Sequence, residues 1–157
     1  MKNEKISLIA LVLALAVCLS SCGLIFGNVA EQGDVTIVVE TADGYEVYKT
    51  YLESVENKKE GAKGVVENLR DRENNPLALE MDDTGYGAFV TAIGSIKQDA
   101  TSDSYVMVYT SVATDSYDGA PTVEYDGMTL YQSGVGISGM TVESGTVILF
   151  RLETYSY

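Results

Sequence analysis

Runs in which apolar residues occupy every second position recur along the sequence, and they restrict the fold to one built mainly from strands. In the run 35–40, every second residue from Val35 is Val or Ile, which is typical of a strand that buries one face. A turn signal follows at 42–44, and then a tyrosine-rich extended run at 45–53. The two runs are expected to pair as a hairpin.

Only one segment has the spacing of a helix. Its apolar residues recur at i, i+3, i+4 and i+7 and form a single stripe, which consists of Ala62, Val65, Val66 and Leu69. A helix is therefore expected over 61–76, ending at the Asn-Asn-Pro sequence of 74–76.

The remaining chain predicts a sheet that this helix covers. Further strands are expected at 77–81, 105–112, 128–131 and 147–152. The stretch 84–95 is expected to form a turn and an irregular connection with Phe89, Val90 and Ile93 in the core, and 113–126 to form a loop. This order predicts an α+β domain, a β-grasp-like small mixed sheet of about five strands covered by one helix.

The N-terminal sequence has the pattern of a secretion signal. A head with Lys2 and Lys5 precedes an apolar core at 8–19, which is shorter than the roughly 20 residues of a membrane span. The exit sequence, Leu-Ser-Ser-Cys at 19–22, resembles the lipobox of bacterial lipoproteins. The resemblance implies cleavage before Cys22 and a diacylglyceryl group on its thiol.

These features predict how the chain is organised and where it is located. We expect a signal peptide at 1–21, a lipidated tether at 22–33 and one domain at 34–157. The lipid on Cys22 would hold the domain on the extracytoplasmic face of the cell membrane, because two or more acyl chains give stable anchoring. Secretion as a free protein is the alternative.

Charge and residue content exclude several classes of function. Removal of 1–21 leaves 8 basic and 22 acidic residues, a net charge of −14, so a nucleic-acid partner is not expected. The chain has no histidine, and its two cysteines fall in the signal and at the lipidation site. Ser-His-Asp and Cys-His catalysis and the usual zinc sites are therefore not available. The acidic residues lack calcium-loop spacing, and we expect no metal site, no required cofactor and no enzymatic activity.

The stretch SGVGISGM at 133–140 contains Gly134, Gly136 and Gly139 at the spacing G-x-G-x-x-G. That spacing binds a dinucleotide only where a helix opens after the glycines. Here a strand pattern follows, so a dinucleotide site is not expected. The glycines are interpreted as a loop between two strands.

Four stretches together resemble a known family of bacterial domains often found on lipoproteins. They are VTIVVE (35–40), DTGYGAFVTAIGSI (83–96), SGVGISGM (133–140) and ESGTVILFRL (143–152). They resemble the transcobalamin-like C-terminal domain family over 34–155. In vitamin B12 carriers the related domain is the smaller lid over the corrin. The resemblance implies capture or presentation of a small molecule, with cobalamin or another corrinoid as the suggested ligand.

Two groups of residues are candidates for ligand contact. Glycines allow backbone amides to approach a ligand, and tyrosine offers a flat face with one hydroxyl group. The first group lies in and before the glycine loop and consists of Tyr131, Ser133, Gly134, Gly136 and Gly139; the second is the tyrosine pair Tyr105 and Tyr109 on one strand.

Two alternatives remain open. The glycines could shape a turn only, and the tyrosines could be ordinary half-buried strand residues. A module for adhesion or protein interaction, which contacts a cell-surface protein through a sheet edge or the tyrosine face and binds no small molecule, is the second functional hypothesis.

Overall fold

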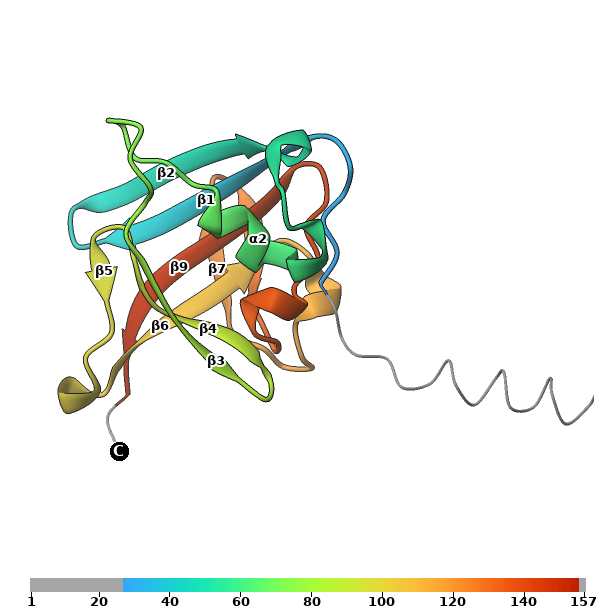
Figure 1. Cartoon of the computed structure of the whole chain (residues 1–157). Helices are drawn as coiled ribbons and strands as arrows, with labels where there is room; N and C mark the ends of the chain where they lie inside the picture. The colour runs from blue at the N-terminus through green and yellow to red at the C-terminus, as the bar shows by residue number, and fades with distance from the viewer. Residues whose placement is uncertain (1–26, 156–157) are drawn as a thin grey trace, which may run out of the picture.

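The computed structural model describes residues 27–155; the predicted signal peptide and the lipidation site at Cys22 lie outside this range. Figure 1 shows a strongly curved large sheet, a smaller sheet and one short α-helix. The strands are β1 (Asp34–Thr41), β2 (Gly44–Tyr51), β3 (Leu79–Thr84), β4 (Gly87–Ile93), β5 (Ile96–Lys97), β6 (Ser104–Thr110), β7 (Thr122–Tyr125), β8 (Met128–Gln132) and β9 (Thr146–Thr154). The helix is α2 (Gly61–Glu67), and the 3-10 turns are η1 (Leu52–Ser54), η2 (Lys58–Glu60), η3 (Ala100–Ser102), η4 (Ala113–Asp115) and η5 (Ile137–Gly139).

The strands form two sheets where the sequence predicted one. The large sheet has six strands in the order β2-β1-β9-β6-β8-β7, and the small one has the order β3-β4-β5. Among the named strands of the described chain, β1 and β9 pair in parallel and the other ladders are antiparallel. The α+β class is confirmed, whereas the five-strand β-grasp arrangement is corrected to this two-sheet architecture.

The first hairpin is confirmed, and the second was missed. β1 and β2 pair from Thr41↔Gly44 outward, as the 42–44 turn predicted. The stretch 84–95, expected to be irregular, contains β4, which pairs with β3 from Thr84↔Gly87. Gly87 has a φ of 110°, a conformation that glycine adopts without steric cost. The loop predicted at 113–126 likewise contains η4 and the short strand β7.

The helix is shorter than the sequence indicated. Its apolar stripe is buried as expected, with Ala62 and Val65 fully inaccessible, but α2 ends at Glu67. The side-chain amide of Asn68 donates a hydrogen bond to the Gly64 carbonyl, 2.8 Å away, and caps the helix. The chain then turns back on itself, with a bridge between Arg70 and Pro76.

Apolar residues fill both faces of the large sheet. One face packs against α2 and the small sheet, through residues that include Val35, Ile37, Val39, Val65, Val66, Ile93, Ile137, Met140, Ile148 and Phe150. The opposite face is covered by the β7–β8 hairpin and forms a second cluster, Val38, Tyr109, Leu130, Val147 and Leu149. Each fully buried side chain of this size contributes about 1.5–3 kcal/mol, so both faces stabilise the sheet.

The end of the predicted tether belongs to the folded body. Val29 is 2% exposed and forms a parallel bridge with Val142. The Ala30 N–H donates to the Val142 carbonyl at 2.8 Å, and the Val142 N–H donates to the Asn28 carbonyl at 2.8 Å. The packed body therefore includes residues 27–30, which lie before the predicted boundary at 34. Among the described helices, none has the length and apolar character needed to cross a bilayer.

Candidate functional site

The glycine loop lies directly against the β3–β4 hairpin. A Cβ atom at Gly136 would come within 2.9 Å of the backbone of Gly87 and of Ala88. Next to this contact, the Ala88 N–H donates to the Ser138 hydroxyl at 3.0 Å. Gly136 therefore allows two backbone segments to approach closely, and Gly139 closes the 3-10 turn by donating to the Gly136 carbonyl at 2.8 Å.

Asp115, a buried acid, accepts hydrogen bonds from both sides of the glycine loop, at Gly134 and at Thr141. The Asp115 carbonyl accepts from the Gly134 N–H at 2.9 Å, and its carboxylate Oδ2 accepts from the Thr141 N–H at 2.7 Å. Burial raises the pKa of Asp115 above its ordinary value, and the hydrogen bonds from Thr141 oppose that shift. The loop is thus anchored by the protein itself.

A small apolar cleft opens beside the glycine loop, between β4 and β6. Its volume is about 90 Å³. Its lining is Ala88, Phe89, Val90, Val106, Met107, Val108, Ser133, Val135, Gly136 and Ile137. Phe89, expected in the core, is 45% exposed here. Its position in β4 alternates with the buried positions of Ala88 and Val90 and faces solvent.

The other predicted contact residues lie elsewhere. Tyr131 lines a separate hollow of about 390 Å³ between the η4–β7 connection and β8. Tyr105 lies near the start of β6, where its ring is tilted against that of Tyr155 with centroids 6.3 Å apart. The structure therefore brings Ser133 and Gly136 to one cleft and places Tyr131 and Tyr105 outside it.

Tyr109 is not part of an exposed stripe. Its side chain is 2% exposed, because the β7–β8 hairpin packs over this face of the sheet. Its hydroxyl donates to Glu153 at 2.5 Å, and burial together with the Glu153 charge raises the pKa of Tyr109. Glu153 also lies 3.6 Å from the Nε atom of Arg151. Tyr109 therefore belongs to a polar network inside the second cluster.

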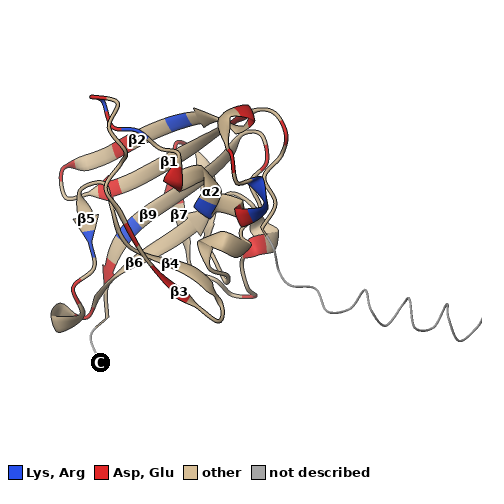
Figure 2. Ribbon diagram, in the orientation of Figure 1, with Lys and Arg blue, Asp and Glu red and all other residues tan. Residues whose placement is uncertain are grey.

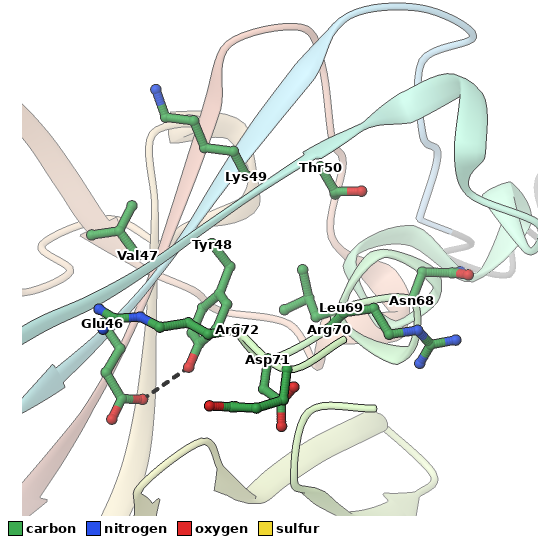
Figure 3. A pocket seen from close by; sticks show the side chains of 11 residues that line it. Glu46, Val47, Tyr48, Lys49, Thr50, Asn68, Leu69, Arg70, Asp71 and Arg72 are labelled. Atoms are coloured by element: carbon green, nitrogen blue, oxygen red, sulfur yellow. Dashed lines mark hydrogen bonds between the residues drawn. The ribbon is translucent and has the colours of Figure 1, made fainter. Parts of the chain in front are cut away.

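A third hollow, larger than the cleft and the Tyr131 hollow, was not predicted. It measures about 640 Å³ and lies between β2 and the segment 68–73 (Figure 3). Its lining is Glu46, Val47, Tyr48, Lys49, Thr50, Asn68, Leu69, Arg70, Asp71, Arg72 and Glu73. Sequence reasoning missed it because 68–73 was assigned to a helix. The available signal was the pair Arg70 and Arg72 in a strongly acidic chain.

Tyr48 forms the floor of this hollow. Its hydroxyl donates to Glu46 at 3.1 Å, as the dashed line in Figure 3 marks. Burial, followed by the hydrogen bond and the charge of Glu46, raises the pKa of Tyr48 to about 12. The Tyr48 hydroxyl is therefore neutral at physiological pH and donates its hydrogen bond to Oε2 of Glu46.

Acidic side chains outnumber basic ones over the described chain. Figure 2 shows acidic residues spread over loops and strand ends, with few basic residues between them. Within 27–155, no three acidic side chains gather closely enough to hold a metal ion. The local features that distinguish this surface are therefore the apolar cleft, the Tyr131 hollow and the hollow with two arginines.

Comparison with known proteins identifies the fold. No family model matches the sequence, and no curated protein matches it. A crystal structure of a candidate metal-binding protein from Ruminococcus gnavus ATCC 29149 is similar, with a TM-score of 0.52 and 14% identity over 79% of this chain and 99% of that chain. Haptocorrin in complex with Cbi is also similar, with a TM-score of 0.52 and 12% identity over 80% of this chain.

The match to haptocorrin covers 26% of that protein. The chain therefore shares its fold with one part of haptocorrin. This agrees with the fold implied by the sequence resemblance to the transcobalamin-like domains.

Proposed function

We propose that this chain is a lipid-anchored extracytoplasmic domain that captures or presents a small molecule, with a corrinoid as the first candidate. The observation that carries the proposal is the likeness to haptocorrin, which was crystallised with Cbi and shares the fold over 80% of this chain. The sequence resemblance to transcobalamin-like domains points to the same ligand class. The N-terminal pattern around Cys22 supports anchoring at the membrane.

The apolar cleft between β4 and β6 suits one face of a flat ligand. Pockets that enclose a small molecule measure about 300–1,000 Å³, and this cleft measures about 90 Å³. The chain would therefore cover part of a ligand and leave the rest to solvent or to a second protein. Phe89 and Met107 supply apolar contact at the cleft. The chain has no histidine, so it would contribute no imidazole to cobalt.

A visible-absorbance titration tests ligand binding. The full chain in detergent is titrated with cobalamin and, separately, with cobinamide. We expect a saturable spectral change that weakens in Phe89→Ala and persists in Tyr51→Ala, whose side chain is 72% exposed on β2. Absence of a saturable change with both corrinoids would refute the corrinoid proposal. An equal response of both variants would refute the cleft as its site.

Radiolabelled palmitate tests the anchor. We expect the wild-type chain, expressed in a bacterium, to incorporate label and to sediment with membranes, because Cys22 would carry the lipid. The variant Cys22→Ala should lose both properties. Equal labelling of the variant would show that the chain is not lipidated at this position.

A further inference from the structure

The outer edge of β2 is open for hydrogen bonding. The Leu52 N–H donates to the Gly33 carbonyl at 2.8 Å, so the main-chain groups of even-numbered residues in β2 point toward β1. Those of Tyr45, Val47 and Lys49 point away from β1, because successive residues of a strand alternate in direction. Within the described chain, β2 pairs with no strand other than β1. The backbone N–H and carbonyl groups of these three residues therefore have no backbone partner there.

The segment 68–73 forms a second wall beside this edge. Main-chain and side-chain groups hold it in place: the Asp71 N–H donates to the Asn75 carbonyl at 2.9 Å, and the Asn75 N–H donates to Asp71 Oδ1 at 2.8 Å. The hollow between the wall and β2 spans Glu46 to Thr50 along the strand. That is a length of about 17 Å for five extended residues.

The wall carries two arginines without ion pairs. Among the cations of 27–155, Lys58, Lys63, Lys97 and Arg151 each lie within salt-bridge distance of an acid. Arg70 and Arg72 do not, although the chain is rich in acids.

Two acids of the hollow are engaged within the protein. Glu46 accepts the Tyr48 hydroxyl, and Asp71 accepts from Asn75. Glu73 also lines the hollow. Because carboxylates bind arginine through paired hydrogen bonds, the hollow combines an open strand edge with two cations suited to an acidic side chain.

We propose that this hollow binds an extended peptide that adds as a strand to the edge of β2, with an acidic side chain of the peptide placed against one of the two arginines, which point away from each other in Figure 3. Main-chain hydrogen bonds to Val47 and Lys49 provide the affinity of such strand addition, and the arginines select the peptide. Repulsion from acids more than about 8 Å away is screened at physiological ionic strength, and two of the three acids that line the hollow, Glu46 and Asp71, already accept hydrogen bonds within the protein. This interface is separate from the corrinoid cleft and does not rest on it.

Hydrogen–deuterium exchange of the full chain in detergent tests the proposal. The probe is a synthetic peptide of alternating threonine and valine with one central glutamate, blocked at both ends, added up to about 1 mM, where even an affinity of about −4 kcal/mol is detected. We expect slower exchange at the amides of Val47 and Lys49. The matched peptide with glutamine in place of glutamate should bind at least about tenfold more weakly, because charge-assisted hydrogen bonds are lost.

Three variants separate the contribution of the two arginines from that of the main-chain hydrogen bonds at the β2 edge. Arg70→Gln with Arg72→Gln should abolish the preference for glutamate over glutamine, and Lys59→Gln, which removes another cation without an ion pair, should keep it. Val47→Pro removes an outward N–H from an edge strand, where proline is tolerated, and should abolish the protection. If Val47→Pro unfolds the chain by circular dichroism, the two arginine substitutions still decide the result.

No protection at Val47 and Lys49 up to the highest peptide concentration would overturn the proposal. So would protection that is equal for both peptides, or that survives Val47→Pro in a folded protein. Corrinoid is absent from this assay, so failure here leaves the absorbance titration unaffected.

Discussion

The ring of Tyr45 in β2 stands edge-on to the ring of Tyr125 in β7, with centroids 5.2 Å apart and planes at 84°. β2 and β7 are the two outer strands of the six-stranded sheet and do not pair with each other. The sheet therefore curls until the start of β2 touches the end of β7 through these two side chains, which leaves the β2 edge at Val47 and Lys49 unpaired. Figure 1 shows this curvature.

The contact between Tyr45 and Tyr125 predicts energetic coupling between the two sheet edges. An edge-to-face aromatic pair contributes about 0.5–1.5 kcal/mol beyond burial. A double-mutant cycle with Tyr45→Ala and Tyr125→Ala, measured by urea unfolding, should give a coupling energy of that size. The same cycle with Tyr86→Ala in place of Tyr125→Ala should give none, because Tyr86 is 88% exposed at a hairpin tip. Additivity in the first cycle would contradict the prediction.

Gly136→Ala should destabilise the protein by about 1–3 kcal/mol, the usual cost of overpacking. The added Cβ would meet backbone atoms of Gly87 and Ala88 at 2.9 Å, and backbone cannot rotate away as a side chain can. Gly85→Ala is the matched control: no atom lies within 4 Å of its Cβ position. Thermal unfolding of both variants checks the prediction, which fails if their midpoints fall equally.

Tyr109→Phe should cost about 1.5–3 kcal/mol, because it removes a hydrogen bond to a charged acceptor. The Tyr109 hydroxyl lies 2.5 Å from Glu153. Tyr155→Phe removes a longer contact to the same carboxylate, 3.3 Å at an exposed position, and should change stability by less than about 0.5 kcal/mol. Chemical denaturation should rank the two variants in this order; the reverse order would exclude a strong Tyr109–Glu153 bond.

Asp115 predicts a specific pH dependence of stability. Burial raises the pKa of Asp115 in the folded protein above the ordinary value of 3.8. At pH values between the unfolded and the folded pKa, the folded protein therefore binds a proton that the unfolded chain has released. This contribution to stability is fully present below pH 3.8 and is lost as the pH rises through the folded pKa. Asp115→Asn has no such titration and retains an oxygen for the Thr141 N–H.

The difference in unfolding free energy between Asp115→Asn and wild type should therefore increase in favour of the variant from pH 4 to pH 7. Urea unfolding at several pH values measures it. Asp115→Ala, which also loses the acceptor, should be less stable than Asp115→Asn throughout. Parallel pH profiles of wild type and Asp115→Asn would show that Asp115 does not titrate in this range.

Hydrophobic periodicity and turn residues predicted the elements whose formation depends on residues close together in the sequence. The period of two from Val35 and the turn at 42–44 predicted β1, β2 and their pairing. The stripe from Ala62 to Leu69 predicted the buried face of α2, and the alternating pattern after the glycines predicted the strand β9. β4 was missed because the glycines around Tyr86 were interpreted as an irregular connection, although two of them frame a tight hairpin turn.

Long-range packing accounts for the remaining differences. Tyr109 was a candidate for ligand contact, with a half-buried strand residue as the alternative, because its own strand does not reveal that β7 and β8 fold over it. The hollow beside β2 depends on the return of the chain between Arg70 and Pro76, which the helical period concealed. Gly136 was assigned correctly to a loop, but its close approach to Gly87 joins segments far apart in sequence.

The bridge between Val29 and Val142 also determines how the body responds to force. A pull from the N-terminal side of the described chain reaches the Gly27–Ser138 hydrogen bond, then this bridge, and then β1. β1 lies between β2 and β9, so tension along it acts across many hydrogen bonds at once. If the proposed lipid at Cys22 anchors the chain, the body should resist extraction until β1 slides past β2 and β9.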